Sequence, residues 1–100
     1  MDEIDIVRLD RGNAGEYRAQ VPDSDAVARL TWIVRGDGAA AVRVAEHTLV
    51  PRALEGRGIA RRLVDALIED ARREGFRIEP QCSYVAAQFQ RHPEWAALRA

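Results

Sequence analysis

Residues 47–60 read His-Thr-Leu-Val-Pro-Arg-Ala-Leu-Glu-Gly-Arg-Gly-Ile-Ala, which places a β-branched run, a turn with two glycines and the start of a helix in succession. Gly56 and Gly58 lack a Cβ, so the turn can present consecutive backbone N–H groups to an anion at the positive end of the helix. The turn is not a P-loop, because Ile59 and Ala60 replace the Lys-Ser/Thr pair that follows the last glycine there. Glycine pairs also occur in ordinary strand-to-helix turns, so an anion site and a plain turn both remain open.

Three arginines, Arg57, Arg61 and Arg62, crowd the beginning of this helix. A helix N-terminus carries about half a positive charge, so each cation there costs roughly 0.3 to 1 kcal/mol unless an anion offsets it. An ion pair between Arg61 and Asp65, one turn further on, would account for one of the three. The remaining charge favours an anion-binding turn.

Upstream of the turn, alternating apolar and polar residues predict three β-strands joined by short loops. These strands cover about residues 16–21, 26–35 and 40–50. Sequential strands with short loops indicate an antiparallel meander, and the length of the third strand allows a bulge near its end.

Downstream, residues 58–74 carry apolar side chains at helical spacing, and Gly75 supplies a stop. Residues 76–79 predict a fourth strand, which makes a strand-helix-strand unit with a parallel pair and a right-handed crossover. A short second helix follows, from Ser83 to about Arg91. The elements together predict an α+β fold.

Length and composition limit the function classes. One hundred residues suffice for one domain with its own core, and we expect residues 1–14, which are polar and contain Arg11-Gly12-Asn13, to form a flexible N-terminus. The net charge of -1 and the dispersed basic residues argue against a dedicated nucleic-acid binder. The single cysteine cannot form an internal disulfide, and no signal peptide or membrane span is evident, so we expect a cytoplasmic protein. All fifteen basic residues are arginine, and none is lysine.

Four segments occur in a characteristic order along the chain. They are His47-Thr48-Leu49-Val50-Pro51, Gly56-Arg57-Gly58-Ile59-Ala60, Pro80-Gln81-Cys82-Ser83-Tyr84-Val85 and His92-Pro93-Glu94-Trp95. Over roughly residues 16–95 the chain thereby resembles the smallest branch of the GNAT superfamily of acetyl-CoA-dependent N-acetyltransferases. Each segment alone is weak evidence, whereas the four in order are specific.

The resemblance implies a GNAT fold, in which the third and fourth strands splay apart to admit the pantetheine arm of CoA and the glycine turn binds the pyrophosphate. The two histidines and the single cysteine show no metal-type spacing, so we expect no metal. The residues expected to contact acetyl-CoA are Leu49, Val50, Gly56, Arg57, Gly58, Ile59, Ala60, Arg61 and Arg62. Glu55 departs from the Gln or Arg of the family motif, and we expect its carboxylate to face solvent and leave the contacts to backbone N–H groups and arginines.

The resemblance also brings His47 and Cys82 forward as catalytic candidates. Histidine ordinarily titrates near pH 6.5, so His47 can accept an amine proton, although a polar strand residue without a catalytic role is the alternative. Glu46, expected on the opposite face, is a weaker base candidate. Cys82 lies at a helix N-terminus, where it can carry the acetyl group with His47 as its base, assist departure of the CoA thiolate, or simply be buried. We favour direct transfer, and Tyr84 is a further proton donor or a core residue.

The function expected from the sequence is acetyl transfer from acetyl-CoA to an amine. The acceptor amine is not identified: a protein terminus, a lysine side chain or a small polyamine all fit. A CoA-binding module without turnover is the main alternative, and a nucleic-acid binder using the helix arginines is a weaker one. No partner other than CoA and the acceptor is indicated, and we expect a monomer or weak dimer.

Overall fold

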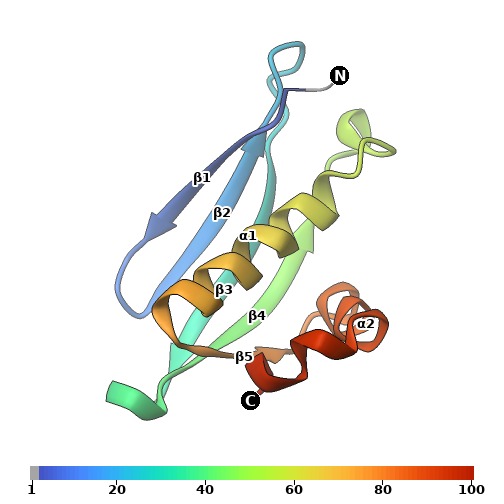
Figure 1. Cartoon of the computed structure of the whole chain (residues 1–100). Helices are drawn as coiled ribbons and strands as arrows, with labels where there is room; N and C mark the ends of the chain where they lie inside the picture. Colours follow the sequence, from blue (N-terminus) through green and yellow to red (C-terminus); the bar gives the residue numbers. More distant parts are fainter. Residues whose placement is uncertain (1–2) are drawn as a thin grey trace.

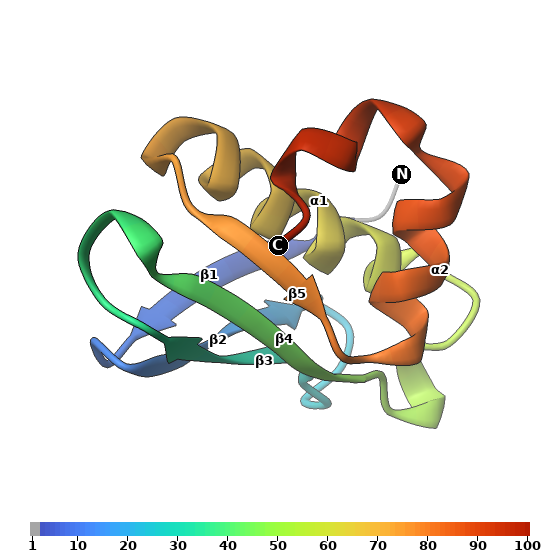
Figure 2. The same cartoon turned by 90° about the horizontal axis from the view of Figure 1, so that it is seen from below.

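The alternating segments form one five-stranded sheet whose apolar side is covered by helices (Figures 1 and 2). The structure, a computed structural model, describes residues 3–100. The strands are β1 (Asp5–Asp10), β2 (Ala14–Gln20), β3 (Ala28–Arg35), β4 (Val42–Leu49) and β5 (Arg77–Pro80). The α-helices are α1 (Ile59–Glu74) and α2 (Ser83–Arg91), and short 3-10 helices cover Gly38–Ala40, Arg52–Leu54 and Pro93–Leu98.

The strands follow one another across the sheet in the order β1-β2-β3-β4-β5. The first four are antiparallel neighbours, and β5 runs parallel to β4 after the crossover through α1. The predicted meander and parallel pair are therefore confirmed. Helix α1 crosses the sheet on the side that also carries α2 (Figure 2), and within residues 3–100 no α-helix covers the other side.

The core lies between α1 and the helix-covered side of the sheet. Leu30 and Trp32 of β3 are fully buried, as are Leu63 and Leu67 of α1. Each large apolar side chain buried in this way contributes about 1.5 to 3 kcal/mol to the stability of the fold. Because Leu30 and Trp32 face the core, Thr31 between them faces the open side of the sheet.

A β-bulge interrupts the pairing of β3 with β4, as the length of the third strand allowed. Thr31 pairs with His47 and Trp32 pairs with Ala45, so Glu46 is an extra residue on β4. Side chains do not alternate strictly between the two faces at a bulge, so alternation no longer supports the expectation that Glu46 and His47 point to opposite faces of the sheet. Beyond the bulge the alternation resumes with His47.

Strand β1 differs from the flexible N-terminus expected over residues 1–14. Residues 5–10 pair with β2 along their whole length, and residues 1–2 lie outside the described part of the chain. The alternation was hidden because the residue that follows Ile6 on the helix-covered face is Arg8. The Arg8 guanidinium forms ion pairs with carboxylates of α1, and contacts so distant in the sequence leave no local pattern.

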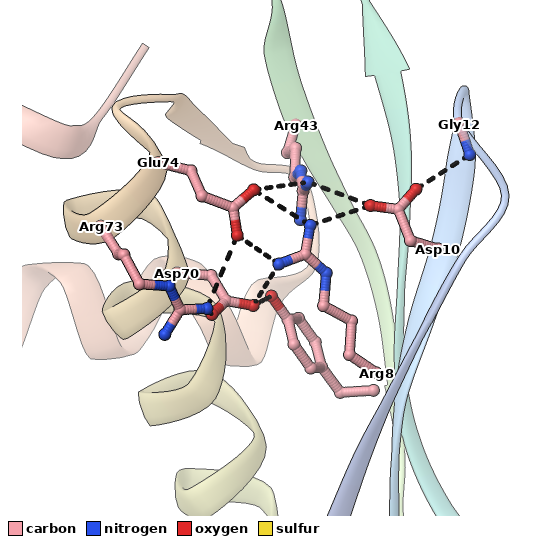
Figure 3. A network of polar contacts seen from close by, with 8 residues as sticks. Arg8, Asp10, Gly12, Arg43, Asp70, Arg73 and Glu74 are labelled. Carbon is pink, nitrogen blue, oxygen red and sulfur yellow. Dashed lines mark hydrogen bonds and ion pairs between the residues drawn. The ribbon is translucent and has the colours of Figure 1, made fainter.

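Those contacts form an ionic cluster between β1, β4 and the end of α1 (Figure 3). Arg8 donates to Asp70 at 3.0 Å and to Glu74 at 3.1 Å, and Asp70 also accepts a 2.6 Å hydrogen bond from the Tyr17 hydroxyl. Arg43 lies 3.5 Å from Asp10 and 3.7 Å from Glu74. Its guanidinium also lies over the rings of Trp32 and Phe76. The cluster fixes β1 to the helix.

Loss of the Glu74 carboxylate should destabilise the fold at neutral pH. Its hydrogen bond with Arg8 lowers the pKa of Glu74 below the ordinary value of 4.5, so its contribution is present above that pH and is lost as the pH falls through the folded-state pKa. We expect Glu74→Gln to reduce the free energy of unfolding at pH 7 by about 1 kcal/mol, since solvent screens a side chain this exposed. Urea denaturation at pH 7 and pH 3 measures the change, which should shrink at the lower pH.

Glu69→Gln is the matched control, because this more exposed carboxylate of α1 has one ion pair among the described residues, with Arg73 at 3.9 Å. It should change the free energy of unfolding by no more than about 0.5 kcal/mol. Equal effects of the two substitutions would show that the cluster does not stabilise the attachment of β1.

Candidate functional site

The glycine turn before α1 has the backbone conformation that only glycine adopts without strain. Gly56 has φ of 80° and Gly58 has φ of 72°, both in the left-handed region. Gly58 is the N-cap of α1, where no side chain caps the helix and the first turn holds no acidic residue. The N–H groups at this end of α1 are therefore available to an external acceptor.

A hollow of about 190 Å³ lies against this turn. Gly56, Gly58 and Ala60 line it, together with Val50, which directly follows β4, and Tyr84 of α2. The hollow thus links the N-terminus of α1 with the place where β4 and α2 meet. Its lining also includes Leu54, Glu55, Ile59 and Arg61.

The three arginines of the turn do not act as one group. Arg57 makes a two-pronged ion pair with Asp23, at 3.0 and 2.9 Å, a partner that sequence reasoning missed. Arg61 donates to Asp65 at 2.8 Å, as anticipated, and it also borders the hollow. Arg62 lines a separate hollow between α1 and the first two strands. The argument that uncompensated charge requires an anion is therefore weaker than the sequence suggested, and Arg61 is the arginine best placed to contact one.

The other expected contacts divide into backbone and side-chain groups. Ile59 is buried in the core, so only its backbone can contribute. Leu49 is exposed, and Val50 is half-buried. Glu55 is exposed as expected, yet it also borders the hollow.

Strands β4 and β5 separate after a short parallel pairing. The register ends at Ala45 opposite Pro80, and β4 continues for four more residues through Leu49. Across from this last part of β4 the chain turns into α2, and the Cys82 N–H donates to the Ala45 carbonyl at 2.9 Å. The end of β4 therefore presents a backbone edge that β5 does not pair, with Cys82 beside it.

Cys82 is half-buried at the N-cap of α2, with its sulfur in contact with Thr48. The Sγ to Oγ1 distance is 3.5 Å. Burial by itself raises the pKa of the thiol, but hydrogen bonds from the Thr48 hydroxyl and from the backbone N–H groups of Val85, Tyr84 and Thr48 outweigh it. The pKa of Cys82 therefore lies below its ordinary value, which increases the fraction of reactive thiolate.

His47 and Cys82 lie on opposite sides of β4. Thr48 pairs with the core residue Leu30, so its side chain, and the sulfur it contacts, belong to the helix-covered side. His47 pairs with Thr31 and is exposed on the open side. The structure brings both residues to the free edge of β4 but does not bring them into contact with each other.

The residue that sequence reasoning missed at this site is Thr48. It was part of the His-Thr-x-Val-Pro segment but received no role. Strand alternation from His47 places it on the other face, which was the one available signal. Its partner is 34 positions away in the sequence, so the contact itself could not be predicted.

Comparison with known families decides the relationship of the chain. Residues 16–98 match the family model described as GCN5-related N-acetyl-transferase. The chain belongs to this family. No curated protein matches it significantly. The mixed five-stranded sheet with its crossover helix is thus the α+β GNAT fold expected from the sequence.

Membership in the GNAT family indicates an acyl-transfer activity. Both tryptophans are buried: Trp32 lies in the core, and Trp95 packs against Phe89 and stacks with His92. Neither ring is therefore exposed to stack on a cofactor.

No helix among residues 3–100 is both long and apolar enough to cross a bilayer.

Proposed function

We propose that this GNAT protein transfers an acetyl group from acetyl-CoA to an amine by direct attack. The observation that carries the proposal is the free edge of β4, which leads from the hollow at the glycine turn to Cys82. The turn would hold the pyrophosphate through the N–H groups of α1, with Arg61 beside it. The edge of β4 offers backbone hydrogen bonds to the amides of an extended pantetheine arm, in the manner of an added strand.

The placement of His47 and Cys82 supports direct transfer over a covalent relay. A thioester at the free edge of β4 would have His47 on the open side of the sheet and Cys82 on the helix-covered side. The amine nitrogen then attacks the thioester carbon and its proton passes to His47. As the C–S bond breaks, its electron pair stays on the CoA sulfur, which takes a proton from the Cys82 thiol, and Cys82 regains a proton from solvent. A relay that uses His47 as the base of Cys82 is disfavoured, because the two residues lie on opposite sides of β4.

Turnover separates this proposal from its alternative, a CoA-binding module without chemistry. The purified protein is incubated with acetyl-CoA and a panel of amines that includes a peptide N-terminus, a lysine side chain and a polyamine. Release of free CoA above the amine-free rate supports acetyl transfer. Tight CoA binding with no amine-dependent release would leave the binding module as the better description.

Charge reversal at Arg61 tests the position of the pyrophosphate. We expect Arg61→Glu to weaken CoA binding about 10-fold or more, because a charge-assisted contact is replaced by repulsion. Isothermal titration calorimetry with CoA measures the affinity.

Arg62→Glu is the matched control for this measurement. It changes the net charge equally in the same turn of α1, but Arg62 faces the separate hollow toward β1 and β2. CoA affinity should stay within about 2-fold of the native protein. An equal loss of CoA affinity in both variants would mean that the phosphates bind elsewhere or that only the net charge of the protein matters.

A further inference from the structure

Thr48 and Cys82 are each fixed by the backbone before their side chains meet. Thr48 is held in β4 by its pairing with Leu30 of β3. Cys82 is held by its N–H bond to Ala45, and its carbonyl accepts the Ala86 N–H in the first turn of α2. Two rigid elements therefore set the 3.5 Å contact between the hydroxyl and the sulfur. Contacts between fixed elements orient a side chain more sharply than contacts between loops.

A hydroxyl can serve Cys82 in both protonation states. When the sulfur is a thiol, its S–H donates to the Thr48 oxygen. When the sulfur is a thiolate, the same hydroxyl rotates and donates its own proton. The Thr48 backbone N–H also points toward the sulfur, as do the N–H groups of Tyr84 and Val85.

We propose that Thr48 is a positioning residue that holds the Cys82 sulfur at the free edge of β4. A change of protonation then needs only rotation of the hydroxyl, not movement of the sulfur. The catalytic consequence rests on the function proposed above: a sulfur fixed beside the thioester stays directed at the leaving group. The state of the thiol itself can be measured without any acetyl transfer.

The titratable side chains around this part of the fold occupy other positions than the Thr48 hydroxyl. Glu46 and His47 belong to the bulge region of β4, with His47 on the open side. Glu79 of β5 is paired with Arg35. Tyr84 of α2 borders the hollow at the glycine turn. Substitution of Thr48 leaves all four unchanged, so a shift in thiol behaviour reports on the hydroxyl.

The test compares Thr48→Val with Thr48→Ser. Valine keeps the shape of threonine and suits a strand but lacks the hydroxyl, whereas serine keeps the hydroxyl and lacks the methyl group. Cys82 is the only cysteine of the chain, so iodoacetamide alkylation followed by mass spectrometry reports on it alone. The alkylation rate is measured from pH 5 to pH 10 for the native protein and both variants.

We expect Thr48→Val to move the midpoint of the alkylation profile upward by about one pH unit and to slow alkylation at pH 7 about 10-fold. Thr48→Ser should stay within about 2-fold of the native protein. A native-like profile for Thr48→Val, or equal changes in both variants, would overturn the proposal, because the hydroxyl would then not be the active group. If Thr48→Val fails to fold by circular dichroism, Thr48→Ala provides the same comparison.

Acetyl transfer is then measured in the same variants. Thr48→Val should lower kcat and leave KM for acetyl-CoA nearly unchanged, and Thr48→Ser should restore kcat. If the native protein shows no transfer, the proposed function fails while the alkylation profiles still decide the role of Thr48.

Discussion

Replacement of His47 by alanine is expected to lower the rate of acetyl transfer by roughly 10² to 10⁴, the usual contribution of a general base. The side chain is exposed on the open side of the sheet, where, within residues 3–100, no α-helix covers the approach of an amine to the free edge of β4. Steady-state release of CoA with a reactive amine measures the effect. CoA affinity should stay close to that of the native protein, because His47 does not border the hollow described at the glycine turn.

His92→Ala is the control for the loss of a histidine. His92 stacks on Trp95 and lies 3.0 Å from Glu94, far along the chain from β4, and its removal should change the rate less than about 3-fold. If His47→Ala retains native activity, His47 is not the base, and the amine loses its proton to another group or to solvent.

Cys82→Ala separates direct transfer from a covalent relay. Direct transfer predicts that this variant keeps substantial activity and that brief incubation with acetyl-CoA alone leaves no acetyl group on Cys82. The mass measurement is clean because the chain has one cysteine and no lysine. A stoichiometric acetyl adduct on Cys82 that passes to an amine at the turnover rate would instead establish the relay.

The sheet, the crossover and the glycine turn could be predicted because each leaves a local pattern. Alternation marks the strands, spacing marks α1, and the two glycines mark a turn whose left-handed backbone the structure contains. Strand β1 left no such mark, because Arg8 occupies an inward position and is neutralised by Asp70 and Glu74 from the other end of the chain.

The same limit explains what was missed at the site. Arg57 was counted as an uncompensated charge because its partner Asp23 is 34 positions away. One of the alternatives left open by the sequence used His47 as the base of Cys82, whereas in the folded protein the sulfur of Cys82 contacts Thr48, the residue that follows His47 on β4. Local periodicity fixes the face of a strand on which a residue lies, and only the tertiary fold decides which residue meets it there.

The largest effect on CoA binding is expected from Gly58→Val. Gly58 adopts φ of 72°, and an added Cβ would meet no protein atom within 4 Å, so the folded protein has room for it. The left-handed backbone costs about 1 to 2 kcal/mol for a residue with a Cβ, and more for a β-branched one, which a stable domain can tolerate. The side chain would occupy the hollow proposed for the pyrophosphate, so CoA affinity should fall at least 100-fold, as measured by calorimetry, while the far-UV circular dichroism spectrum remains native.

Gly75→Val makes the comparison specific to the ligand. Gly75 ends the same helix with φ of 80°, and its added Cβ would also meet no protein atom within 4 Å. The two substitutions therefore impose similar backbone strain at opposite ends of α1, and their thermal midpoints should fall by similar amounts. Only Gly58→Val should lose CoA, since Gly58 borders the hollow and Gly75 does not. Retention of CoA by Gly58→Val would mean that the phosphates bind away from the turn, and loss in both variants would trace the effect to the stability of α1 rather than to the shape of the site.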